Sequence, residues 1–149
     1  MIRVSEPHFA KSNVELLQSA RAVMRQGHVL AAGCLGRSCL ELHLRRLATW
    51  YGCEPRNGKA GIWLYCERLL DKGIIDKTAR REIKQAVKVG NRCAHGEAVH
   101  WSDVCTMLDS VLGLLSRYWI PNEKMADTFK NCPAGEWPDA ANSFDDGNL

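Results

Sequence analysis

The residues best suited to chemistry lie in the run GNRCAHG, residues 90–96, near the end of a predicted amphipathic helix that begins at Asp76. Asn91 and His95 are four residues apart, so on a helix their side chains project from one face and can meet the same ligand. Histidine is the side chain that exchanges protons near neutral pH. Gly90 costs about 1 kcal/mol relative to alanine inside a helix, so we expect something at this position to compensate for it.

Two interpretations of Asn91 and His95 remain open at this point. In the first, the pair belongs to a binding or catalytic site. In the second, the two side chains form a hydrogen-bonded pair that satisfies buried polar groups, or they end the helix before Gly96. The sequence spacing fits both interpretations.

A second candidate group lies on the longest predicted helix, residues 28–51, which we expect to be central in the fold. Arg37 and Glu41 are four residues apart in the segment AAGCLGRSCLEL, residues 31–42, whose other members are mostly small or apolar. Glu41 is therefore predicted to be partly buried. The two residues form either an intrahelical ion pair or part of the support for a site at Asn91 and His95.

The hydrophobic pattern predicts an all-α bundle of four to five helices that forms one domain over residues 1–120. Besides the two helices above, helices are expected at 13–26, after a capping pattern at Ser12 and Glu15, and from Ile62 until Lys72. The last helix, 103–119, is expected to have Ser102 as its N-cap. Residues 121–149 contain three of the five prolines and no sustained periodicity, which predicts an irregular acidic tail.

Composition excludes several classes of protein. Among the 149 residues no apolar run approaches the roughly 20 needed to cross a bilayer, and the first residues have no secretory signal pattern. The seven cysteines are scattered, without a Cys-x-x-Cys pair, and most occupy apolar helix positions. We therefore expect a cytoplasmic protein with reduced thiols, no membrane contact, no structural metal and no cofactor.

Charge is unevenly distributed along the chain. Residues 1–120 carry 18 Lys or Arg against 11 Asp or Glu, whereas residues 121–149 carry 2 against 6. The helix from Asp76 has a basic outer face, formed by Lys77, Arg80, Arg81, Lys84 and Lys88. This asymmetry is compatible with a polyanionic partner such as RNA, with an acidic tail that screens the domain, or with a solvated surface.

The helix order and two segments resemble the HEPN superfamily (higher eukaryote and prokaryote nucleotide-binding), and within it a branch of bacterial domains of unknown function found beside restriction and defence genes. The segments are GRSCLELHLRRLATWYG, residues 36–52, and VKVGNRCAHGEAV, residues 87–99. The resemblance covers about residues 10–120. It implies a helical bundle, a homodimer and RNA as a partner.

Active members of that superfamily carry an arginine followed four to six residues later by a histidine, and two such motifs meet across a homodimer to form a metal-independent ribonuclease. Asn91 and His95 match this motif, but Gly90 stands where the arginine would be. Arg92 or Lys88 would then have to supply the cation. Replacing Gly90 by Arg is expected to restore the bidentate phosphate contact, provided that the helix can take a side chain at this position.

The resemblance implies a transesterification in which His95 moves the proton, a cation stabilises the phosphorane and Asn91 orients the phosphate or the imidazole. Arg37 and Glu41 are expected near Asn91 and His95, with Glu41 holding the imidazole tautomer. The alternative function is a non-catalytic helical dimerisation or interaction module. A homodimer is also expected because apolar residues cover more than one face of the last helix.

Overall fold

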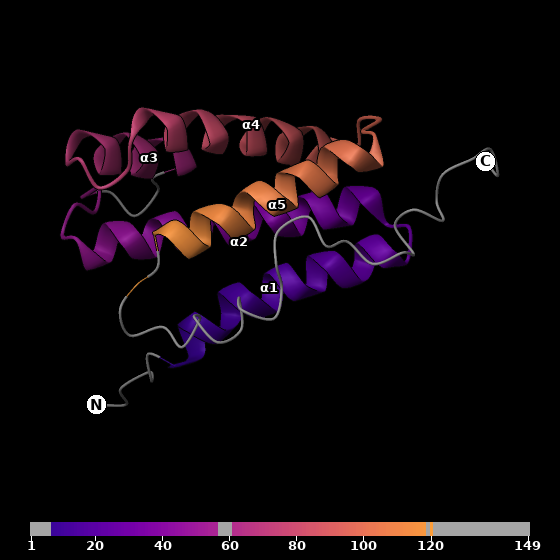
Figure 1. The fold of residues 1–149 in the computed structure, drawn as a ribbon, viewed down its shortest axis with the longest axis horizontal. Helices are drawn as coiled ribbons and strands as arrows, with labels where there is room; N and C mark the ends of the chain where they lie inside the picture. Colours follow the sequence, from indigo (N-terminus) through magenta and orange to yellow (C-terminus); the bar gives the residue numbers. More distant parts are fainter. Residues whose placement is uncertain (1–6, 57–60, 119, 121–149) are drawn as a thin grey trace.

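The computed structural model describes residues 7–56, 61–118 and 120, so the predicted acidic tail lies outside the described residues. The described chain forms five helices and no strand, which confirms the predicted all-α bundle (Figure 1). No described helix has both the length and the apolar character that a membrane crossing requires. The helices are α1 (Pro7–Arg25), α2 (Val29–Trp50), α3 (Ile62–Asp71), α4 (Lys77–Ala94) and α5 (Trp101–Arg117).

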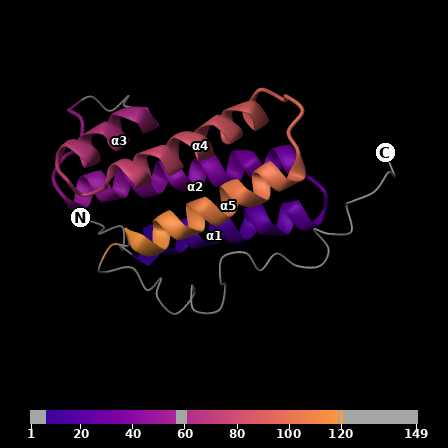
Figure 2. The ribbon, with the colours of Figure 1, turned by 45° about the horizontal axis from the view of Figure 1, so that its top comes forward.

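Helix α2 is the centre of the bundle, as predicted for residues 28–51. It packs against each of the other four helices. Helix α1 lies along one side of α2 and α4 along the other, while α5 crosses close to α2 (Figure 2). Helices α3 and α4 are joined by a short turn and lie side by side (Figures 1 and 2).

Small residues on α2 explain why two other helices can pack so close to it. A Cβ atom added to Gly33 would lie 2.3 Å from the Sγ atom of Cys93 on α4. One added to Gly36 would lie 2.5 Å from Cδ2 of Leu108 on α5. Both distances are shorter than any van der Waals contact, so the two glycines set the separation between α2 and its neighbours.

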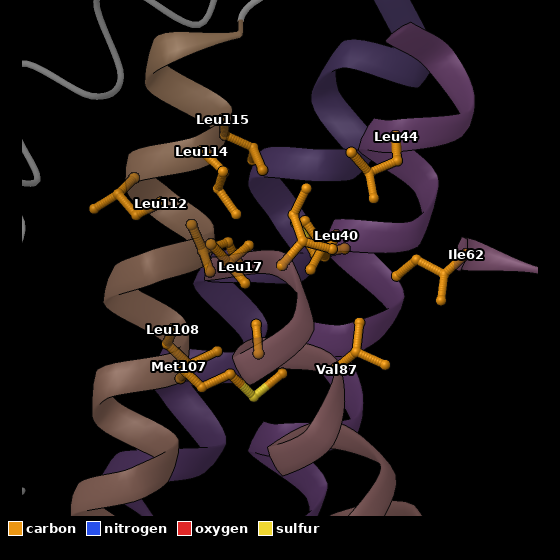
Figure 3. Close-up of a cluster of buried hydrophobic side chains, with 14 of the residues drawn as sticks. Leu17, Leu40, Leu44, Ile62, Val87, Met107, Leu108, Leu112, Leu114 and Leu115 are labelled. Carbon is orange, nitrogen blue, oxygen red and sulfur yellow. The ribbon is translucent and has the colours of Figure 1, made fainter. Parts of the chain in front are cut away.

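Leucine-rich faces from several helices form the core (Figure 3). Leu40 and Leu44 of α2 and Leu108, Leu114 and Leu115 of α5 are at most 2% exposed. Complete burial of one such side chain stabilises the fold by about 1.5–3 kcal/mol, so this layer dominates the energy of the bundle.

The apolar residues that cover more than one face of α5 are buried by the other helices of the same chain. Eight of its 17 residues are buried without any second protomer: Val104, Cys105, Met107, Leu108, Val111, Leu112, Leu114 and Leu115. The breadth therefore gives no independent support to a dimer surface on α5. The homodimer remains a prediction of the family resemblance.

Two predicted helix starts are wrong. Helix α1 begins at Pro7 instead of near residue 13, and proline suits the first turn because its missing N–H would have no helical partner there. Helix α5 is capped by His100 instead of Ser102. The Nδ1 atom of His100 accepts the N–H of Ser102 at 3.2 Å, so an imidazole performs the role expected of a serine hydroxyl.

The predicted cap at Asp76 is confirmed, since its Oδ1 atom accepts the N–H of Ala79 at 2.7 Å.

His43 is a buried polar residue in the middle of α2. It is 1% exposed, and its Nε2 atom lies 2.9 Å from the carbonyl oxygen of Tyr118, to which it donates in the corresponding tautomer. Burial lowers the pKa of His43 to about 4; the hydrogen bond to Tyr118 opposes this shift, and the charge of Arg46 adds to it. His43 is therefore neutral in the folded protein at neutral pH.

His43 predicts a specific loss of stability in acid. Its pKa is 6.5 in the unfolded reference and about 4 when folded, so the unfolded chain binds an extra proton between these values. The stability that the neutral ring contributes is complete above pH 6.5 and is lost as the pH falls toward 4, by on the order of 2–3 kcal/mol. His43→Gln keeps an N–H donor for Tyr118 but does not titrate. Urea unfolding at about pH 7 and about pH 4.5 should show a smaller loss of stability in this variant than in the parent, and equal losses would contradict the account.

Candidate functional site

The predicted site lies where α4 ends, and the helix ends through its backbone. His95 is the C-cap residue, and the chain reverses at Gly96, whose φ of 69° is in the left-handed region. Gly96 donates its N–H to the carbonyl of Cys93 at 3.1 Å. Glu97 donates to the carbonyl of Arg92 at 3.0 Å. These two bonds satisfy the last helical carbonyls, so Gly96 ends the helix and the His95 side chain is not needed for it.

The side chains of Asn91 and His95 do not form the hydrogen-bonded pair that the structural interpretation predicts. Their link is the helical bond from the His95 N–H to the Asn91 carbonyl at 3.0 Å. The His95 side chain is exposed and makes no hydrogen bond to any described residue, while Asn91 is half-buried. The imidazole is therefore open to a ligand that approaches from solvent.

Arg92 is occupied in holding the chain that follows α4. Its Nε atom lies 3.2 Å from the carboxylate of Glu97, and its Nη2 atom donates to the carbonyl of Ala98 at 3.0 Å. A guanidinium held in this way positions a loop and is poorly placed to take over the role of a motif arginine. Lys88, the other cation considered, is exposed and forms no ion pair with a described residue.

Gly90 has a packing role that its sequence position did not reveal. A Cβ atom at residue 90 would lie 2.6 Å from Cβ of Arg37 and 3.1 Å from its Cγ and Cδ atoms. The aliphatic part of Arg37 therefore crosses α4 over the bare backbone of Gly90, and this contact between α2 and α4 compensates for the glycine. The condition set for Gly90→Arg, that the helix can take a side chain at this position, is not met, because the Arg37 side chain already fills the space.

Glu41 is bonded along its own helix. Its carboxylate lies 3.4 Å from Nη1 of Arg37 and 3.8 Å from Nη2 of Arg45. The prediction of an intrahelical ion pair is confirmed, and Arg37 does lie against the motif at Gly90. No hydrogen bond joins Glu41 to His95 within the described chain, so Glu41 does not hold the imidazole tautomer within a single protomer.

A continuous polar stripe on α4 was only partly evident from the sequence. Six residues follow one another at alternating intervals of four and three, so they share one face of the helix, and five of them are exposed. The stripe spans about 27 Å from end to end. None of its four cations forms an ion pair with a described residue. We call these residues the α4 stripe: Lys77, Arg81, Lys84, Lys88, Asn91 and His95.

Two carboxylates beside the α4 stripe are neutralised by ion pairs. Glu82, the one acidic residue of α4, is ion-paired with Arg117 of α5. Glu67 of α3 forms an ion pair with Arg80, whose Nε atom lies 2.8 Å from the Glu67 carboxylate. The exposed face of α4 therefore presents positive charge without an interspersed carboxylate, which creates a positive potential along the helix.

Thiol chemistry is disfavoured at this site. Burial raises the pKa of the Cys93 thiol, and burial likewise raises the pKa of Cys66 and of Cys105 to about 11. A thiol with a raised pKa is a poor nucleophile because little thiolate is present at neutral pH. Within the part of the chain that the structure describes, no three potential metal ligands are grouped together. The arrangement is thus suited to binding phosphates through cations and to proton transfer through His95.

Comparison with known proteins gave no match to a family model, to a curated protein or to a solved structure. The HEPN resemblance therefore remains a prediction from the two sequence segments. The α4 stripe and the end of α4 are the features of the described chain that bear on function.

The contact between Gly90 and Arg37 can be tested with a matched pair of glycine substitutions. Gly90→Ala should destabilise the protein by about 1–3 kcal/mol, because the added methyl group overlaps the Arg37 Cβ atom. At Gly113 of α5 an added methyl group would meet no described atom within 4 Å, so Gly113→Ala should stabilise by up to about 1 kcal/mol through helix propensity. Chemical denaturation measures both. A stabilised Gly90→Ala protein would refute the close contact.

Proposed function

We propose that the protein binds RNA along the α4 stripe, with the cations of the stripe contacting successive phosphates. The observation that carries this proposal is the row of four cations, none ion-paired within the described chain, on a face without carboxylates. The row from Lys77 to Lys88 covers about 16 Å of helix axis, enough for several phosphate groups. Cations that neutralise phosphates gain affinity by releasing condensed counterions, and this requires no further element of the fold.

Charges of alternating sign along a helix face are typical of a solvated surface laced with salt bridges. The α4 stripe instead has cations as its only charged residues. The neighbouring carboxylates of Glu67 on α3 and Glu82 on α4 each pair with an arginine that is not in the α4 stripe. The HEPN resemblance independently implies RNA as the polyanion. These two lines of support come from different observations, one from charge geometry and one from sequence motifs.

The second candidate function is a metal-independent endoribonuclease of a bacterial defence or toxin system, acting in the cytoplasm. It is favoured by the exposed His95 imidazole at the end of the α4 stripe. The RNA 2′-hydroxyl would attack the adjacent phosphorus and the 5′-oxygen would leave, with His95 taking the 2′-hydroxyl proton or giving a proton to the 5′-oxygen. Asn91 would orient the phosphate, and Lys88 or the Arg37 guanidinium would stabilise the developing charge. A homodimer would bring a second His95 to the same substrate, as the resemblance implies.

The alternative is a non-catalytic helical dimerisation or interaction module, with an unidentified protein partner. In that case the exposed face of α4 would contact an acidic protein surface or a second copy, and His95 would have no chemical role. Binding and cleavage assays with RNA separate this alternative from both RNA hypotheses.

Charge reversal on the α4 stripe tests RNA binding. Lys84→Glu and Lys88→Glu should each weaken binding of a labelled RNA and lower the slope of log affinity against log salt by about 0.7–1, because one phosphate contact is lost. Fluorescence anisotropy over a series of KCl concentrations measures both quantities.

Arg25→Glu is the matched control for these variants. It makes the same change in net charge at the end of α1, which lies on the opposite side of α2 from α4 (Figure 1). It should leave the affinity nearly unchanged. Equal weakening in all three variants would show that only net charge matters, and a parent protein that binds no RNA would overturn the proposal.

His95→Ala separates catalysis from stability. Because the side chain is exposed and bonded to no described residue, the substitution should change the free energy of unfolding by less than about 0.5 kcal/mol. In the ribonuclease hypothesis the parent protein cleaves RNA in the presence of EDTA and leaves a cyclic phosphate, and His95→Ala abolishes this activity. Gel analysis of end-labelled RNA measures this cleavage. If the parent leaves the RNA intact, the enzyme hypothesis is wrong and the binding hypothesis is unaffected.

A further inference from the structure

An exposed tryptophan lies on the helix next to the α4 stripe. Trp63 of α3 is 42% exposed, although it is a large apolar side chain in a chain with a well-filled core. Trp63 and Glu67 are four residues apart, so they share one face of α3. Glu67 forms an ion pair with Arg80 of α4, with 2.8 Å between the carboxylate and Nε. Trp63 therefore projects from the side of α3 that faces α4.

The hairpin geometry places Trp63 beside the middle of the α4 stripe. Helices α3 and α4 are joined by a short turn, run in opposite directions and lie side by side over the first half of α4 (Figures 1 and 2). Because the helices are antiparallel, a residue one turn before Glu67 on α3 lies beside a residue one turn after Arg80 on α4. The residue one turn before Glu67 is Trp63, and the residue one turn after Arg80 is Lys84.

We infer that Trp63 is a stacking platform for a base of single-stranded RNA whose phosphates follow the α4 stripe. This inference rests on the proposed RNA binding and specifies the form of RNA that is bound. An indole beside a row of cations matches the two requirements of single-strand recognition, namely a positively charged path for the backbone and an aromatic face for an unpaired base. Bases in a duplex are stacked on one another and cannot reach Trp63.

The charge between α3 and α4 is compatible with an RNA strand that runs from Lys84 to Trp63. Glu67 is the acidic residue nearest to Trp63 on the same face of α3, and its ion pair with Arg80 neutralises it. A strand that passes from Lys84 toward Trp63 therefore passes a carboxylate whose charge is already neutralised. Because every base has an aromatic face, the platform selects single strands over duplexes and does not select a particular sequence.

The test compares a labelled single-stranded RNA of about 12 nucleotides with the duplex that it forms with its complement. The parent should bind the single strand more tightly than the duplex. Trp63→Ala should weaken single-strand binding by about tenfold and leave duplex binding unchanged, whereas Trp63→Phe keeps a ring and should retain most of the affinity. Trp50→Ala removes an indole of similar exposure, 46%, from the end of α2 and should have no effect.

The outcomes separate this inference from the proposed function. If Trp63→Ala binds the single strand as tightly as the parent, or if the parent binds duplex equally well, the stacking role is wrong. If Lys84→Glu still weakens binding in that case, RNA binding along the α4 stripe stands without it. If the parent binds neither RNA, the proposed function itself is wrong. Thermal unfolding followed by circular dichroism verifies that each variant is folded, as expected for exposed positions.

Discussion

The close contact between α2 and α4 is the constraint on which the rest of the structure depends. The two helices meet at two glycines, with Gly33 of α2 against Cys93 and Gly90 of α4 against Arg37. Because the backbones approach so closely, the small and apolar side of α4 is pressed onto α2, and the opposite side is left to solvent with its lysines and arginines. The same contact brings Arg37 next to the end of α4, one residue from Asn91.

The end of α4 combines a fixed backbone with an exposed imidazole. Gly96 and Arg92 fix the end of α4 through backbone and side-chain hydrogen bonds. His95 lies between them on the chain, and its side chain forms no hydrogen bond with any described residue. RNA binding needs a row of cations in a fixed geometry, which the helix provides, whereas catalysis also needs an imidazole within hydrogen-bond reach of the reacting group. The single chain meets the first requirement more fully than the second, so binding is the primary proposal.

Features determined by nearby residues were predictable from the sequence. The helical periodicity, the Asp76 cap and the central position of the helix over residues 28–51 depend on local patterns, and the structure confirms them. The role of Gly90 depends on Arg37, which is distant in the sequence, and no periodic pattern reveals such a crossing. Glu41 was expected at His95 but pairs with Arg37 and Arg45 on its own helix, where one-turn neighbours are always within reach. The α4 stripe could have been found by counting intervals of four and three from Lys77, since that signal is present in the sequence.

The most direct test of the account is to map where RNA touches the protein. A heteronuclear NMR titration of the isotope-labelled chain with a short single-stranded RNA reports this residue by residue. The account predicts that the largest shift changes lie on the exposed face of α4 from Lys77 to His95 and at the indole N–H of Trp63, while α1 is unchanged. Changes concentrated on α1, with the α4 stripe unaffected, would contradict it.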